Sequence, residues 1–96
     1  MIRSFKDTAT ENIYHGISSK KTRKFSEDVV NVALRKLDQL NASLDINDMR
    51  VPPGNHLEKL KGDLKDYFSV RINEQYRIIF QWKNGDAFNV SIVDYH

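Results

Sequence analysis

The sequence predicts an α+β fold, because a helical segment in the first half is followed by strand-like segments joined by short loops. Residues 26–40 carry apolar side chains at helical spacing, which indicates an amphipathic helix. Residues 67–72, 76–82 and 87–93 instead alternate apolar and polar side chains, the pattern of half-buried strands. Loops this short join antiparallel neighbours, so we expect the helix to lay one apolar stripe on an antiparallel sheet.

The helix expected over residues 26–40 has a clear start. Ser26 is a good N-cap, and Glu27 and Asp28 place negative charge at the positive end of the helix dipole. Asn41 is a plausible end. The residues expected on the buried face recur at helical spacing and are Val30, Ala33, Leu34, Leu37 and Leu40.

The residues before this helix predict two smaller elements. Residues 1–5 alternate like a short edge strand, and Asp7 or Thr8 is expected to cap a short helix that ends at His15-Gly16. A basic segment without acidic or apolar residues follows over 18–24, and its cations are Lys20, Lys21, Arg23 and Lys24. Such a run is either a solvated loop or a contact for phosphate groups of RNA.

The first two strands predict a pair of facing arginines. With the three residues 73–75 as the loop, Phe68 lies opposite Phe80, and Arg71 lies opposite Arg77 on the face away from the core. Facing like charges cost roughly 0.2–1 kcal/mol, so an anion between them is one explanation. The other explanation is that each arginine lies on a solvent-exposed face with its apolar stem packed.

The third strand extends the same surface. A three-residue loop over 83–85 would place Phe88 opposite Phe80 and Val90 opposite Ile78, with all of these on the core side. On the other face, Ser91 would then lie beside Arg77. Val93 and Tyr95 would project on that face too, while the chain ends in a tyrosine and a histidine, Tyr95-His96.

Composition limits the possible classes of function. The chain of 96 residues is expected to form one domain over 1–96, and its formal charge of +2 is only mildly favourable for an anionic partner. It has no cysteine, which excludes disulfides and thiolate metal sites, and its three histidines lack metal-ligand spacing. No apolar run approaches a membrane span, and the polar start does not suggest a signal peptide, so a cytoplasmic protein without a metal or cofactor is expected.

Periodicity alone does not decide the structure of residues 55–65, where leucines fit helical spacing between Pro/Gly-rich breaks. A resemblance helps here. The segments 54–63, 69–78 and 92–96, and especially Arg-Ile-Asn-x-Gln-Tyr-Arg with a terminal Asp-Tyr-His, resemble the HigB branch of the RelE/ParE toxin superfamily. The resemblance covers essentially the whole chain. It implies a RelE-like toxin fold, with N-terminal helices packed on one face of a small, mostly antiparallel β-sheet, and a strand at residues 57–60.

The resemblance also implies a function. Such toxins belong to type II toxin–antitoxin systems and cut mRNA on the ribosome by attack of a ribose 2′-OH on the adjacent phosphate, which needs a base, cations and an acid. It implies that Arg77 stabilises the transition state and that Tyr95 and His96 assist. Arg71, Lys59 and Lys61 would add positive charge, Lys61 matching the lysine before glycine in the family. The implied partners are the ribosome, mRNA and a HigA-like helix-turn-helix antitoxin, with operator DNA bound only through the antitoxin complex.

The identity of the general base stays open at this point. Some HigB relatives carry histidine in Leu-His-x-Leu-Lys-Gly, whereas this chain has Glu58 there and its histidine at His56. On a strand, His56 and Glu58 point to the same side, so either could act as the base, or neither, in which case Tyr95 or His96 would accept the first proton. Two other functions stay open as well: a ParE-like toxin that binds DNA gyrase without nuclease chemistry, and a non-enzymatic RNA-binding or partner-binding module that uses the loop over 20–24.

Overall fold

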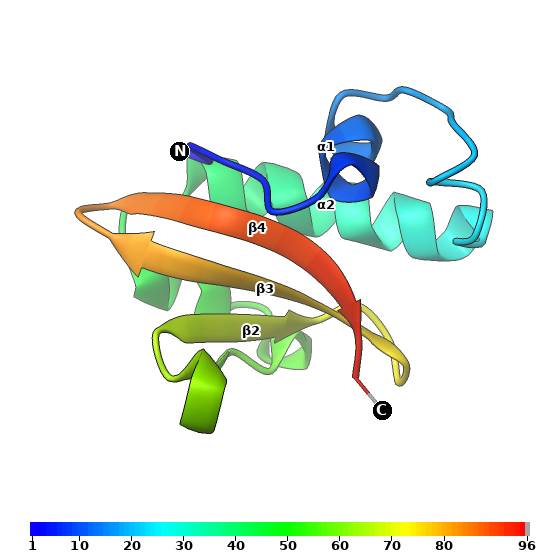
Figure 1. Cartoon of the computed structure of the whole chain (residues 1–96). Helices are drawn as coiled ribbons and strands as arrows, with labels where there is room; N and C mark the ends of the chain where they lie inside the picture. Colours follow the sequence, from blue (N-terminus) through cyan, green and yellow to red (C-terminus); the bar gives the residue numbers. More distant parts are fainter. Residues whose placement is uncertain (96) are drawn as a thin grey trace.

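The structure is a computed structural model that describes residues 1–95. It confirms the α+β prediction: helices α1 (Thr8–Tyr14) and α2 (Glu27–Ala42) cover one face of an antiparallel sheet (Figure 1). The sheet has the order β1-β2-β3-β4, and its strands are β1 (Glu58–Lys59), β2 (Tyr67–Arg71), β3 (Tyr76–Lys83) and β4 (Asp86–Asp94). Two short 3₁₀ helices, η1 (Ile46–Arg50) and η2 (Pro53–Asn55), connect α2 to β1, and a third, η3 (Gly62–Leu64), connects β1 to β2.

Helix α2 begins as the sequence predicts. The Ser26 side chain accepts a hydrogen bond from the Val29 backbone amide at 3.2 Å, which satisfies one free amide of the first turn. The buried face is rotated slightly from the predicted stripe. It contains Val29, Ala33, Leu37 and Leu40, whereas Val30 and Leu34 are half-buried at its edge. For α1, Asp7 is the cap, with its carboxylate 2.7 Å from the Thr10 amide.

The hydrophobic core lies between the helices and the sheet. Ala33, Leu37 and Leu40 of α2 are fully buried together with Val70, Ile78 and other apolar residues of the strands. The face of the sheet that does not meet the helices carries the residues of opposite parity, including Arg71 and Arg77. We call this second face the open face. Residues 1–5 do not form a regular strand but bridge to β4 in parallel at Ile2–Ala87 and Phe5–Val90.

The register between β2 and β3 is confirmed. Phe68 pairs with Phe80, Val70 with Ile78, and Arg71 with Arg77. Residues 58 and 59 form the strand that the family resemblance implied, although it is only two residues long.

The predicted register between β3 and β4 is wrong near the turn. The loop has two residues, Asn84 and Gly85, both at positive φ (54° and 81°), as a type I′ turn requires, and Lys83 pairs with Asp86. Phe88 therefore pairs with Gln81 and not with Phe80, which puts it on the open face, and Ala87 takes the core position.

A β-bulge then restores the predicted faces. The register shifts again between Ile79 and Gln81, where Asn89 on β4 adopts a positive φ of 51°. From there Val90 and Ile92 return to the core, and Ser91 pairs with Ile79 and not with Arg77. Arg77 pairs with Val93. The second half of β4 thus presents the faces that the sequence predicted, although with different partners.

Candidate active site

Arg77 lies on the open face near the start of β3, opposite the last residue of β2, and is only 6% exposed. Its Nη1 donates to the Glu58 carboxylate at 3.0 Å, and its Nη2 donates to the His56 backbone carbonyl at 2.7 Å. Its Nε is buried and has no hydrogen-bond partner within residues 1–95. The guanidinium is thus held by two hydrogen bonds, and its Nε–H remains unpaired. A small movement of the side chain would let this N–H donate to an oxyanion.

Beside Arg77 the surface forms a cleft of about 270 Å³, lined by His56, Arg71, Asn73, Glu74, Arg77 and Tyr95. The Tyr95 ring packs on the guanidinium of Arg77, with 4.9 Å from Cζ to the ring centroid. The arginine pair, His56, Glu58 and Tyr95 were all predicted as site residues, and the fold brings them together. His96, which was predicted with them, lies outside the described residues.

The loop over residues 73–75 holds the chain end over this cleft, and the sequence did not reveal this role. The Asn73 side chain accepts hydrogen bonds from the backbone amides of Gln75 and Tyr76, at 2.8 and 2.7 Å, which fixes the loop. The Gln75 backbone carbonyl accepts a hydrogen bond from the Tyr95 amide at 2.7 Å, and the Gln75 side chain donates one to the Asp94 carboxylate at 3.1 Å. Tyr95 is therefore tied to the β2–β3 loop one residue beyond the end of β4.

Lys36 of α2 is a second contributor that the sequence did not indicate. Its ammonium donates to the Arg71 backbone carbonyl, at the end of β2. Burial lowers the pKa of Lys36, and the charges of Arg35, Arg71 and Arg77 lower it further. The spacing of α2 places Lys36 at the edge of the apolar face, but only the folded chain shows its partner. The cleft thus has a third cation behind its two arginines.

Two predicted cations lie elsewhere. The Lys59 ammonium binds the Lys65 carbonyl at 2.8 Å and lies 5.0 Å from the Phe68 ring centroid, because Lys59 projects from the opposite side of β1 to Glu58. Lys61 is exposed at the start of η3 and does not line the Arg77 cleft. The short strand β1 therefore places Glu58 in contact with Arg77, whereas Lys59 and Lys61 project away from the cleft.

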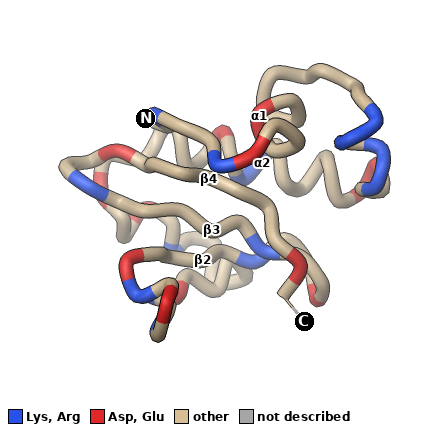
Figure 2. The backbone as a smooth tube through the Cα atoms, viewed as in Figure 1, with Lys and Arg blue, Asp and Glu red and all other residues tan. Residues whose placement is uncertain are grey.

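The four cations of the segment 20–24 are exposed on the loop between α1 and α2, where Figure 2 shows basic residues gathered. Thr22 is buried and exchanges hydrogen bonds with Ser19 within a turn. Lys24 lies over the Phe25 ring, and Phe25 packs edge-on against Tyr76, the residue before Arg77. This loop is therefore anchored at the end of the sheet that holds the cleft.

No group of three or more His, Asp or Glu side chains in the described part of the chain is arranged to hold a metal ion. Residues 1–95 also contain no helix long and apolar enough to cross a membrane.

Comparison with known proteins identifies relatives along the whole chain. Residues 3–96 match the family described as RelE-like toxin of type II toxin-antitoxin system HigB. Toxin HigB-1 of Vibrio cholerae is 43% identical over 89 residues, which cover 93% of this chain and 92% of that protein. Endoribonuclease HigB of Proteus vulgaris is 30% identical over 103 residues and covers both chains completely.

Solved structures agree on the fold. The YoeB toxin in a heterotetrameric YoeB–YefM toxin–antitoxin complex from Staphylococcus aureus superposes with a TM-score of 0.59 at 20% identity, covering 100% of this chain and 98% of that one. The YoeB dimer from the same organism superposes with a TM-score of 0.59 at 22% identity, covering 99% of this chain and 94% of that one. These similarities confirm the RelE-like toxin fold that the resemblance implied.

Proposed function

This chain belongs to the HigB-like family of RelE-like toxins of type II toxin–antitoxin systems, and we propose that it is an endoribonuclease that cuts mRNA on the ribosome. The observation that carries the proposal is the buried Arg77 guanidinium, held by Glu58 and His56 beside Arg71 and under the Tyr95 ring. The relative from Proteus vulgaris that aligns over the whole chain is named an endoribonuclease. The comparisons name HigB toxins and give no support to the gyrase-binding alternative.

The proposed reaction is an internal transfer within RNA. A ribose 2′-oxygen loses its proton to a base and attacks the adjacent phosphorus, while the bond to the 5′-oxygen of the next nucleotide breaks and that oxygen takes up a proton. The products are a 2′,3′-cyclic phosphate and a 5′-hydroxyl. Negative charge grows on the non-bridging oxygens in the transition state, where a fixed cation is most effective.

We assign that stabilising role to Arg77, with Arg71 opposite it as a second phosphate contact. Arg77 is already ordered by two hydrogen bonds, so little reorganisation is needed when charge develops. Tyr95 and His96 are proposed to assist in proton transfer or base stacking at the chain end. Lys59, Lys61 and the loop cations Lys20, Lys21, Arg23 and Lys24 are proposed to contact RNA of the message or ribosome outside the cleft.

The geometry gives His56 and Glu58 different proposed roles. One oxygen of the Glu58 carboxylate accepts a hydrogen bond from Arg77, so we propose that Glu58 positions the guanidinium. His56 lines the cleft, and an imidazole has an ordinary pKa near 6.5, which suits proton transfer at neutral pH, whereas a glutamate is near 4.3. We therefore propose His56 as the base.

The partner of a type II toxin is an antitoxin, and we propose a HigA-like helix-turn-helix protein that also carries the complex to operator DNA. The ribosome and its bound message are the proposed substrate assembly, which places the protein in the cytoplasm.

The test is to map cleavage sites on a message translated in a purified system with wild-type protein and with Arg77→Ala. Wild type should give cuts at defined positions, and Arg77→Ala should remove them. The same message without its start codon is the control for ribosome dependence and should stay intact. Cleavage that survives Arg77→Ala in a folded protein would refute the assignment, and equal cutting of the untranslated message would refute ribosome dependence.

A further inference from the structure

The open face carries side chains in three successive rows across β2, β3 and β4. The first row contains Arg71, Arg77 and Val93 and borders the cleft. The second row is Ser69, Ile79 and Ser91, all of them buried, and the hydroxyls of both serines lack a hydrogen-bond partner within residues 1–95. The third row is Tyr67, Gln81 and Phe88. Because rows are two residues apart, the third lies roughly 13–14 Å from the first.

The third row differs from its surroundings in carrying two half-exposed aromatic rings, one on each side of Gln81. The Tyr67 ring is met by the ammonium of Lys6, 5.4 Å from the ring centroid. Lys6 is hydrogen-bonded through its backbone amide to Val90 of β4, whereas Tyr67 belongs to β2. The ring and the cation therefore meet across the open face, over β3.

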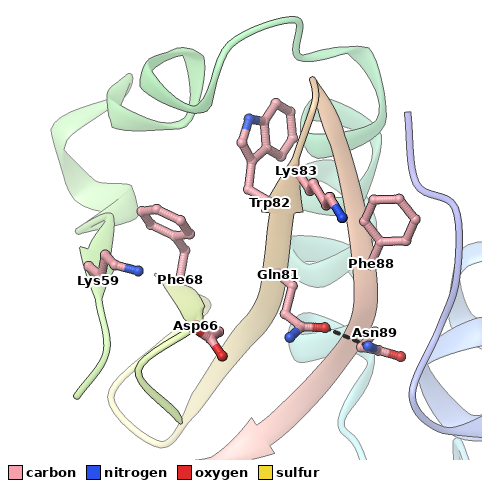
Figure 3. Close-up of a pocket in the computed structure, with 8 residues that line it drawn as sticks. All are labelled: Lys59, Asp66, Phe68, Gln81, Trp82, Lys83, Phe88 and Asn89. Carbon is pink, nitrogen blue, oxygen red and sulfur yellow. Dashed lines mark hydrogen bonds between the residues drawn. The ribbon is translucent and has the colours of Figure 1, made fainter. Parts of the chain in front are cut away.

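Beyond this row lies a hollow of about 580 Å³. Gln81, Lys83, Phe88 and Asn89 line it from β3 and β4, and Lys59 and Phe68 line the opposite side (Figure 3). Gln81 and Asn89 are joined by a hydrogen bond of 2.6 Å. Asp66 is the single acidic residue of the lining, against the two lysines. Trp82 also lines the hollow and is the one tryptophan of the sequence.

Aromatic rings interleaved with cations and amides are the chemistry of single-stranded nucleic-acid binding. Bases stack on the rings, cations contact the backbone, and amides accept or donate at base edges. A purely apolar partner is less suited, because it would bury Lys83 and Gln81 without hydrogen-bond partners. An acidic peptide is less suited, because it offers no bases to stack on the two rings. The charge and the polar groups together favour an RNA strand.

We propose that Tyr67 and Phe88, with Lys6 and Lys83, form a base-stacking subsite for the RNA strand whose scissile phosphate lies at Arg77. The proposal rests on the proposed endoribonuclease function and extends it along the open face. The subsite binds nucleotides that flank the cut. Between the subsite and Arg77, the RNA strand passes over the second row, Ser69, Ile79 and Ser91.

The test uses the protein's own tryptophan as the reporter. A short 2′-O-methyl oligoribonucleotide, which lacks a free 2′-OH and cannot be cut, is titrated into wild-type protein while the fluorescence of Trp82 is followed. Tyr67→Ala and Phe88→Ala should each weaken binding about 5- to 150-fold, the range for loss of one stacked base. Tyr67→Phe, which keeps the ring, should bind within about twofold of wild type. Lys83→Ala should reduce the salt dependence of binding, whereas Arg50→Ala, an equal loss of charge at an exposed position of η1, should not.

Cleavage of a translated message gives an independent second reading, in which kcat/KM should fall for Tyr67→Ala and Phe88→Ala and persist for Tyr67→Phe. Normal RNA affinity or normal cleavage in the alanine variants would refute the subsite without contradicting the proposed endoribonuclease function. Normal RNA affinity together with lost neutralisation by the purified antitoxin would assign the surface to the antitoxin instead. A wild-type protein that neither binds RNA nor cuts a translated message would overturn the proposed function itself.

Discussion

Replacing Arg77 with alanine separates its role in catalysis from its role in folding. A single preorganised donor to a developing oxyanion contributes about 2.7–4 kcal/mol, so Arg77→Ala should lower the cleavage rate roughly 10²- to 10³-fold. Breaking a fully buried ion pair destabilises a protein by about 3–5 kcal/mol, because it leaves one charge without its partner. Here the remaining partner is Glu58, whose side chain is 47% exposed against 7% for Arg77, so water can solvate it. We therefore expect a loss of about 1–2 kcal/mol in the free energy of unfolding.

For a chain of 96 residues, a loss of that size lowers Tm by roughly 4–16 °C and leaves the protein folded at assay temperature. Thermal unfolding followed by circular dichroism measures the first quantity, and primer extension on a translated message measures the second. Arg77→Lys is the matched control, since it keeps the charge but cannot donate to Glu58 and His56 through one planar fork. A folded Arg77→Ala protein that cuts within tenfold of wild type would refute the transition-state role.

Three further substitutions test the surroundings of the site and the attachment of the N-terminus. Glu58→Gln keeps an oxygen that can accept a hydrogen bond from Arg77, so the cleavage rate should fall less than tenfold if Glu58 only positions the guanidinium. Loss of the general base lowers the rate about 10²- to 10⁴-fold, and we expect this larger loss for His56→Ala. A larger loss for Glu58→Gln than for His56→Ala would identify Glu58 as the base. For Asp86, desolvation acts to raise the pKa, but hydrogen bonds from Arg3 and the N-terminal ammonium outweigh it, and the pKa lies below the usual 3.8. Because the folded-state pKa is lowered, the stability difference between wild type and Asp86→Asn should be constant between about pH 5 and 7 and disappear as the pH falls below about 3.8 in urea titrations. A difference that persists at low pH would show that these ion pairs do not anchor the N-terminus.

The register between β2 and β3 could be predicted because one odd loop fixes it. Apolar residues on both strands must share the core face, and only residues 73–75 then satisfy the count. This placed Arg71 opposite Arg77. The register between β3 and β4 could not be predicted, because Asn84-Gly85 suits both a two-residue turn and part of a three-residue one. The bulge at Asn89 also left no trace in the alternation of apolar residues.

The site was predictable where its residues follow strand parity and not where they depend on distant partners. Arg77 and Tyr95 were found because Arg77 lies on β3 and Tyr95 directly follows β4, and the faces of both strands could be counted. Lys36 and Gln75 were missed, because their contacts with Arg71 and Asp94 join residues 35 and 19 positions apart. Lys59 and Lys61 were placed near the cleft by resemblance, and a two-residue strand turns the first away from it.

The bulge at Asn89 has a consequence for function that can be tested by deletion. Phe88 and Tyr95 are seven residues apart, an odd separation that puts two side chains on opposite faces of a regular strand. They share the open face because the bulge adds one residue to β4. Deleting Asn89 should therefore remove the bulge and leave every later pair in place, including Ile78 with Ile92.

Deletion of Asn89 loses the hydrogen bonds to Gln81 at 2.6 Å and to the Ser4 hydroxyl at 2.8 Å, about 2 kcal/mol together, and relieves a positive φ that costs about 1 kcal/mol. The net loss of about 1 kcal/mol should leave a folded, active protein. Deletion of Ser91 also removes one residue but lies beyond the bulge, so it turns Ile92 out of the core and Tyr95 away from Arg77. Ile92 alone represents about 2–3 kcal/mol of apolar burial, and the inverted pairs around it add to this, so we expect an unfolded or inactive protein. Thermal unfolding and message cleavage compare the two deletions directly, and equal inactivation of both would show that strand parity does not govern the site.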